Sequence, residues 1–394
     1  MFSHCFFNQK ILALAVNNAV DNRSILTTFA ILCILILISF RKTAKEQPLS
    51  ISQTNQMKGL AILIIIVHHV ALSLGNIGYL SLLYHLGFPS VSIFLVLSGY
   101  GVFLSTEKKG LNNFFSKRVM RVYIPFILAM ICKILIFDYF ILNERSRVAS
   151  SFVNIFLFPA TLDMNMWFII YILFWYCITY VIFSLNKSNK SKIFYFFLTA
   201  IVVGISPAPN TWVHNSFSFP FGCWIASNSK IIIERLENLL EGKRPTFSNI
   251  FAHLKKQLNH YTETFTLFVS FAIVCLHLWV WMKSPSPNAN IYSPIISAIA
   301  HDILGISFAI LVIGLIILLG KLKIRSTFLN FLGENSFELY LVHGTLLSLF
   351  RLISGMDFVV TFFVYFIIVC MSSIILKKLS SFVSKLLLKN IDNG

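Results

Sequence analysis

The chain has 394 residues, of which 57% are hydrophobic and only 12% are charged, and its mean hydropathy is +0.79. A soluble protein carries about twice that charged fraction, so the composition excludes a soluble globular protein and indicates a membrane protein with several spans. The net charge of +17 is typical of a nucleic-acid-binding protein, but the distribution of the basic residues argues against that class.

Eleven apolar runs follow one another along the chain, several of them close to the shortest length that crosses a bilayer as a helix. Their apolar residues are continuous and do not alternate with period two, which favours helices over barrel strands. We therefore predict an all-α, polytopic integral membrane helical bundle with about 10–11 transmembrane helices. The runs are 25–40, 59–74, 90–105, 122–142, 164–185, 193–206, 217–233, 265–282, 295–319, 336–354 and 358–376.

The basic residues separate the loops into two classes. With the C-terminus placed in the cytoplasm, most of the 32 lysines and arginines fall in cytoplasmic loops, as the positive-inside rule demands. The surplus of basic residues in loops that face anionic membrane lipid therefore accounts for the basic pI, and no nucleic-acid partner is expected. The seven cysteines form no Cys-x-x-Cys pair, so we expect neither a disulfide framework nor a zinc site.

We predict three regions along the chain. Residues 1–54 hold one N-terminal helix, residues 55–377 form the main transmembrane domain, and residues 378–394 form a basic cytoplasmic tail. The largest hydrophilic segment, about 230–263, mixes both charge signs. It is interpreted either as amphipathic helices on the cytoplasmic face or as a solvated connector.

The first candidate functional residues are in the second apolar run. Lys58 and His69 are eleven residues apart, which is close to three full helical turns, so both side chains point the same way. They are about 16 Å apart along the axis, which places the lysine at the membrane surface and the imidazole near mid-depth. An ionisable side chain inside a membrane is a functional candidate, and the alternative is a hydrogen bond to a neighbouring helix. His68 is expected to face another element.

Two further clusters follow in chain order. The sequence from Ser98 through Gly99 and Tyr100 to Gly101 is expected either to break its helix and free polar groups, or to supply small residues for helix packing. Arg118 and Arg121 are three residues apart and share a helical face at the cytoplasmic boundary. Their two guanidiniums suit phosphate oxygens, and lipid headgroups are the alternative ligands.

The last cluster is in the run 336–354. Glu338 and His343 enter this run with Tyr340 between them, and an intramembrane carboxylate is either structurally paired or functional. Further polar residues in or beside the spans are expected only to join helices: Lys133, Asp138, Asp163, His301 and Asp302.

These motifs, in this order, resemble those of the membrane-bound acyltransferase 3 family, the O-acyltransferases of bacterial cell-surface polysaccharides. The similarity covers roughly residues 56–376, and the run 25–40 is additional to the ten-helix family core. Lys58 stands where many members carry arginine, and it supplies the charge without the bidentate fork. The matching residues are Lys58 and His69, the segment SIFLVLSGYGVFLS, Arg118, Arg121 and Pro125, Met166-Trp167-Phe168, and Gly333, Ser336, Tyr340, Leu341 and His343.

The resemblance implies an O-acetyltransferase of the bacterial inner (cytoplasmic) membrane. It would move an acyl group, most often acetyl, from cytoplasmic acetyl-CoA, a co-substrate, to a hydroxyl of a surface polysaccharide or its lipid-linked glycan precursor, without a metal. Acyl-CoA, the glycan acceptor and membrane lipid are the expected partners.

The resemblance also implies roles for individual residues. His69 would be the general base, acting either on the acceptor hydroxyl or on a relay that carries the acyl group outward, and Glu338 and His343 would support the site from another helix. The donor phosphates would bind Lys58, Arg118 and Arg121, and the donor channel would be lined by Ser98, Gly99 and Tyr100. Further candidates for the site are His68, Trp167, Tyr340 and His343.

Two other classes of function remain open from the sequence. A transporter or flippase of lipid-linked sugars also needs basic cytoplasmic patches and polar residues within the membrane, although no internal repeat is evident in the chain. A membrane subunit that only recruits an acyl carrier would bind a coenzyme A analogue without turnover.

Overall fold

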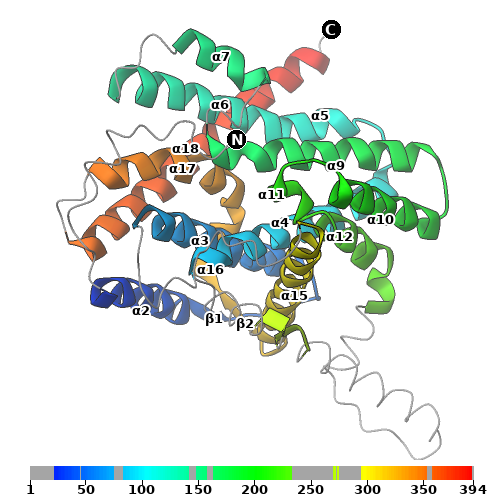
Figure 1. The fold of residues 1–394 in the computed structure, drawn as a ribbon, viewed down its shortest axis with the longest axis horizontal. Coiled ribbons are helices and arrows are strands. Elements are labelled where there is room, and N and C mark those ends of the chain that lie inside the picture. The colour runs from blue at the N-terminus through cyan, green and yellow to red at the C-terminus, as the bar shows by residue number, and fades with distance from the viewer. Residues whose placement is uncertain are drawn as a thin grey trace, which may run out of the picture.

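The computed structural model is an assembly of helices (Figure 1). It describes residues 22–44, 46–74, 83–141, 148–157, 163–232, 269–271, 273–274, 294–352 and 357–392. The helices are α2 (Asn22–Ile38), α3 (Ile51–Leu74), α4 (Leu83–Lys109), α5 (Phe114–Arg118), α6 (Ile124–Cys132), α7 (Val148–Leu157), α9 (Trp167–Ser184), α10 (Asn189–Ile205), α11 (Asn210–Val213), α12 (Ser218–Ser227), α15 (Pro294–Lys321), α16 (Thr327–Glu334), α17 (Ser336–Leu352) and α18 (Phe358–Asp392).

The predicted all-α, multi-pass membrane bundle is confirmed. Among the described residues, six helical stretches are long and apolar enough to cross a membrane, and they comprise α3, α4, Phe114–Ile136, α9, Ser297–Lys321 and Phe358–Leu387. Of the other predicted spans, α2, α10 and α17 have 17 residues each and α12 has 10. Most of the predicted run 265–282, and the segment 233–263, lie outside the described residues.

Helix α3 begins at Ile51, eight residues before the apolar run that predicts it. Two glutamines in its first turns are polar but buried, because their side chains bind backbone groups of neighbouring segments. The side-chain oxygen of Gln53 accepts from the Leu49 amide at 2.9 Å, and that of Gln56 accepts from the Ser326 amide at 2.8 Å. Lys58 therefore lies two turns inside the helix instead of at its start, and His69 lies five residues before the end.

A small antiparallel pair of strands, β1 (Phe40–Lys42) and β2 (Ile324–Ser326), lies beside this start of α3. Short helix α16 follows β2, and its N-terminus is capped by Ser326, whose hydroxyl oxygen accepts from the Leu329 amide. Neither the strands nor α16 is predicted by the apolar runs, because these segments are stabilised by contacts with other elements: the strands pair with each other and β2 packs on α3 and α15, while α16 packs on α2 and α3.

Two helix crossings are close enough that only glycine fits. Helices α3 and α16 meet backbone to backbone: a Cβ on Gly59 would overlap the carbonyl oxygen of Leu329, and a Cβ on Gly333 would overlap that of Asn55. Helices α4 and α12 lie side by side in the same way (Figure 1), with Gly99 against the Phe219 carbonyl and Gly222 against the Val96 carbonyl. Helix α4 is continuous through residues 98–101, so the expected break is wrong and the packing alternative accounts for Gly99.

Two charged residues of the predicted span 122–142 pair with each other instead of joining two helices. The Lys133 ammonium lies 3.0 Å from the Asp138 carboxylate within the π-helical stretch Lys133–Ile141. A π-helix places residues i and i+5 next to each other, which explains a pairing that an α-helical wheel does not predict.

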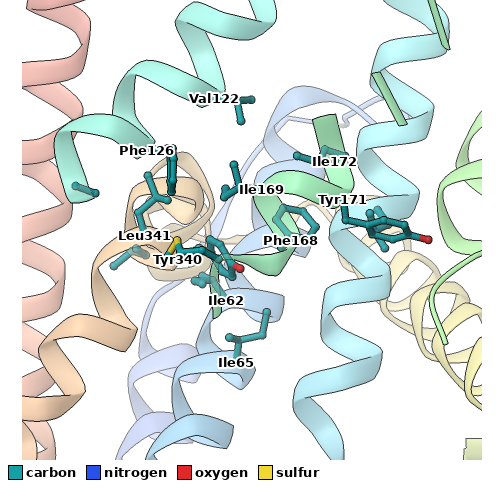
Figure 2. Close-up of a cluster of buried hydrophobic side chains, with 14 of the residues drawn as sticks. Ile62, Ile65, Val122, Phe126, Phe168, Ile169, Tyr171, Ile172, Tyr340 and Leu341 are labelled. Atoms are coloured by element: carbon teal, nitrogen blue, oxygen red, sulfur yellow. The ribbon is translucent and has the colours of Figure 1, made fainter. Parts of the chain in front are cut away.

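The largest buried cluster joins α3, α6, α9 and α17 (Figure 2). In Figure 2 the rings of Phe168 and Tyr340 lie above Ile62 and Ile65, with Phe126 and Leu341 on the neighbouring helices. The candidate site residues are on these helices, and this core fixes the positions of the helices relative to one another.

Candidate functional site

His69 and His343 come together between α3 and α17. Their ring centroids are 5.1 Å apart at an interplanar angle of 44°. His343 is fully buried, and its Nδ1 lies 2.7 Å from the carbonyl oxygen of Tyr340. A carbonyl only accepts, so Nδ1 carries the proton and Nε2 carries a lone pair. This Nε2 is buried and has no hydrogen-bond partner among the described residues.

His68 faces another element, as the helical spacing predicts. Its Nδ1 donates to the carbonyl oxygen of Leu83 at 3.0 Å, which ties the end of α3 to the start of α4. The His68 ring lies where a Cβ on Gly87 would be, so it fills the space between the two helices. Its ring lies edge-on to His69 at 4.9 Å. The contacts of His68 are those of a residue that packs a helical hairpin.

Lys58, Arg118 and Arg121 form what we term the basic cluster. Arg121 is exposed and interacts electrostatically, as a like charge, with both Lys58 and Arg118. Within the described part of the chain, no acidic side chain is within ion-pair distance of any of the three. Three cations held close together without an ion-paired carboxylate form a site suited to an anion.

Arg118 is held by aromatic rings. Its guanidinium carbon lies 4.0 Å from the centroid of Phe114 and 5.8 Å from that of Tyr176. Such stacking fixes the plane of a guanidinium. One terminal guanidinium nitrogen of Arg118 also donates to the Phe114 carbonyl oxygen at 3.5 Å, and the other terminal nitrogen can donate to a ligand.

Glu338 lies in the first turn of α17, and its charged neighbours are Lys377 and Arg121. It precedes His343 by five residues, about 140° around the helix and about 7 Å along it. The structure therefore places this buried carboxylate toward the basic cluster, on a different face of α17 from His343. Lys377 in turn donates to the Glu334 carbonyl and to the side-chain oxygen of Asn335.

The remaining sequence candidates lie in aromatic and packing positions. Tyr340 contacts Phe168 at 5.4 Å between ring centroids, and its buried hydroxyl has no partner in the described part of the chain. Trp167 lies 6.1 Å from Phe168 and continues this aromatic group. Ser98 and Tyr100 are half-buried on α4, on either side of the packing glycine Gly99.

Two polar side chains lie beside His343 and have no role in the motifs. Asp163, whose carboxylate accepts from the Asn165 amide at 2.8 Å, precedes α9. A Cβ on Gly344 would lie 2.8 Å from the Asp163 carboxylate and 2.5 Å from the Asn165 side-chain nitrogen. Sequence reasoning finds Asp163 only as a polar residue next to a span, because nothing local indicates that it touches α17.

A second polar group joins α15 to the turn before α12. The Asp302 carboxylate accepts from the Ser216 hydroxyl at 3.0 Å and the Phe217 amide at 3.1 Å, and the rings of His214 and His301 stack at 4.2 Å. Burial, together with the neighbouring His301, lowers the pKa of His214 to about 4. Asp302 and His301 thus join helices, as the sequence predicts.

A comparison with protein-family models identifies the family of the chain. The model of a family described as an acyltransferase domain matches residues 51–378, a range that contains the His69–His343 pair, the basic cluster and Asp163. No curated protein matches the chain, and no solved structure does. Because the family model covers most of the chain, the protein belongs to the acyltransferase 3 family and is a membrane acyltransferase.

Proposed function

We propose that this membrane acyltransferase moves an acyl group, in the simplest case acetyl, from cytoplasmic acyl-CoA to a hydroxyl of a bacterial cell-surface polysaccharide or its lipid-linked precursor. The observation that carries the proposal is the layout of α3. One helix holds Lys58 in the basic cluster and, about 16 Å further along, His69 beside His343. An anion site and an imidazole pair at opposite ends of one helix suit a phosphate-bearing thioester.

The donor is proposed to bind through its phosphates. The arginines offer planar forks for phosphate oxygens, and Lys58 adds a compact charge. Glu338 interacts electrostatically with both Lys377 and Arg121, so we assign Glu338 to positioning the basic cluster. We place the basic cluster and the C-terminus on the cytoplasmic side of the bacterial inner membrane, in keeping with the positive-inside distribution of lysines and arginines.

The transfer step uses His69 as general base. His69 takes the proton of the acceptor hydroxyl while the hydroxyl oxygen attacks the thioester carbonyl carbon. A carbon–oxygen bond forms, the carbon–sulfur bond breaks, and the proton passes to the leaving thiolate. The products are the ester and the free thiol of coenzyme A, so no oxidant or metal enters the balance.

Neutralising Lys58 or Arg121 is expected to weaken donor binding. In Lys58→Gln and Arg121→Gln, the KM for acetyl-CoA should rise about tenfold or more with a smaller change in kcat, because each substitution removes a charge-assisted hydrogen bond of about 1.5–3 kcal/mol. Lys187→Gln is the matched control, since Lys187 is exposed after α9. Initial rates against acetyl-CoA concentration measure the effect. An unchanged KM in both variants would remove the basic cluster from donor binding.

Labelled donor tests the function itself. Membranes that contain the protein should transfer radioactive acetyl from acetyl-CoA to extracted polysaccharide, and membranes of a deletion strain should not. Binding of a coenzyme A analogue without any transfer would favour the subunit that recruits an acyl carrier. Movement of lipid-linked sugar without acetyl label would favour the flippase. Comparison of polysaccharide NMR spectra from the deletion strain and its parent would identify the acceptor.

A further inference from the structure

We propose that Asp163 is a positioning residue of the transfer reaction, whose carboxylate stabilises the positive charge that the His69–His343 pair gains when it takes the acceptor proton. The inference rests on the proposed function and adds a residue that the sequence motifs leave without a role.

The first argument is the fit of Asp163 onto α17. The Asp163 and Asn165 side chains lie where a Cβ on Gly344 would be, so they touch the α17 backbone at the residue after His343. The amide of Asn165 holds one carboxylate oxygen of Asp163 at 2.8 Å. The carboxylate is therefore fixed beside the histidine by both a hydrogen bond and a glycine-dependent contact.

The second argument is the set of groups that face the imidazole pair. His68 and His69 approach His343 from α3, Tyr340 lies one turn before it on α17, and Tyr365 of α18 donates its hydroxyl proton to the His343 carbonyl at 2.9 Å. None of these groups carries a negative charge at neutral pH. Asp163, whose carboxylate lies against the backbone of Gly344, supplies a negative charge next to His343.

The third argument is the unused hydrogen-bonding capacity at this point. His343 Nε2 and the Tyr340 hydroxyl are both buried and lack a partner among the described residues, and Tyr340 also interacts electrostatically with Asp163. Buried polar atoms are normally paired, so unpaired ones at the same place mark where a substrate group or a transferred proton is accommodated.

These observations combine into one role. When His69 takes a proton, its second ring nitrogen can donate to His343 Nε2, which shares the charge between the two rings. In a buried site a charge is costly unless an opposite charge is near. Asp163 supplies that charge without touching the reacting atoms, so it lowers the energy of the protonated pair and leaves donor binding unchanged.

The test is Asp163→Asn, with Asp357→Asn as the matched control. Asp357 caps α18 through the Val359 amide at 2.8 Å, as Asp163 caps its own turn, and it is exposed at the start of α18. Asparagine keeps a capping oxygen at both positions and removes only the charge. We expect kcat for labelled acetyl transfer to fall about tenfold or more in Asp163→Asn, with an unchanged KM for acetyl-CoA and both kinetic parameters unchanged in Asp357→Asn.

A second variant, Gly344→Ala, should displace the carboxylate and lower kcat in the same way. The proposal is overturned if Asp163→Asn keeps the wild-type kcat, if only its KM changes, or if it elutes as aggregated protein in detergent while Asp357→Asn does not. Failure of the proposed function looks different: the wild-type protein itself would then transfer no label.

Discussion

The substitution His69→Ala is expected to abolish acyl transfer while the protein remains inserted and folded. A general base contributes about 10²–10⁴-fold to the rate, and alanine leaves no group at this point of α3 that can take the hydroxyl proton. The His69 ring is half-buried and, unlike that of its neighbour His68, makes no hydrogen bond to another helix within the described part of the chain. Transfer of labelled acetyl per mole of solubilised protein is the measurement.

His68→Ala is the control for this experiment. It removes the hydrogen bond to Leu83 and the contact with Gly87, so we expect a loss of about 1 kcal/mol in stability but continued turnover. Wild-type turnover in His69→Ala, or complete loss of turnover in a well-folded His68→Ala, would show that His69 is not the general base.

The second large effect is expected at Gly99. A Cβ at this position would overlap the carbonyl oxygen of Phe219, and backbone cannot move aside as a flexible side chain can. Gly99→Ala should therefore separate α4 from α12 and lower the stability by at least about 1–3 kcal/mol. Thermal unfolding in detergent, followed by the loss of soluble protein, measures the change.

Gly101 provides a control two residues away. A Cβ there would meet nothing within 4 Å, so Gly101→Ala should be as stable as the wild type or slightly more stable, since alanine favours a helix interior. Equal unfolding temperatures for Gly99→Ala and the wild type would contradict the close α4–α12 crossing. Comparing the unfolding temperatures of Gly99→Ala and Gly101→Ala tests the packing role of this motif, apart from any role in lining a donor channel.

The fold class follows from the sequence because continuous apolar runs have few stable conformations in a membrane. Helix ends are harder to predict. The start of α3 is polar, and Gln53 and Gln56 are buried only because Leu49 and Ser326 supply backbone amides for them. Helix α18 likewise continues to Asp392, through residues predicted as a basic tail.

The site is predictable where its geometry lies within one helix. The spacing of Lys58 and His69 depends only on the pitch of α3. Arg118 ends α5 and Arg121 lies in the π-helical stretch Val119–Tyr123, so their spacing differs from the α-helical turn on which the sequence prediction rests. The position of Asp163 depends on Gly344, which is 181 residues away in sequence, and no local pattern indicates that contact. Glu338 shows the same limit, because its neighbours Lys377 and Arg121 come from other helices.

An experimental structure with coenzyme A bound would test the central claim most directly. The claim is that the basic cluster holds the phosphates of the donor while the thiol end reaches His69 along α3. We expect phosphate density against Lys58 and Arg121 and the sulfur atom beside the His69 and His343 rings. Phosphates bound elsewhere, or a sulfur atom directed away from His69, would contradict the account.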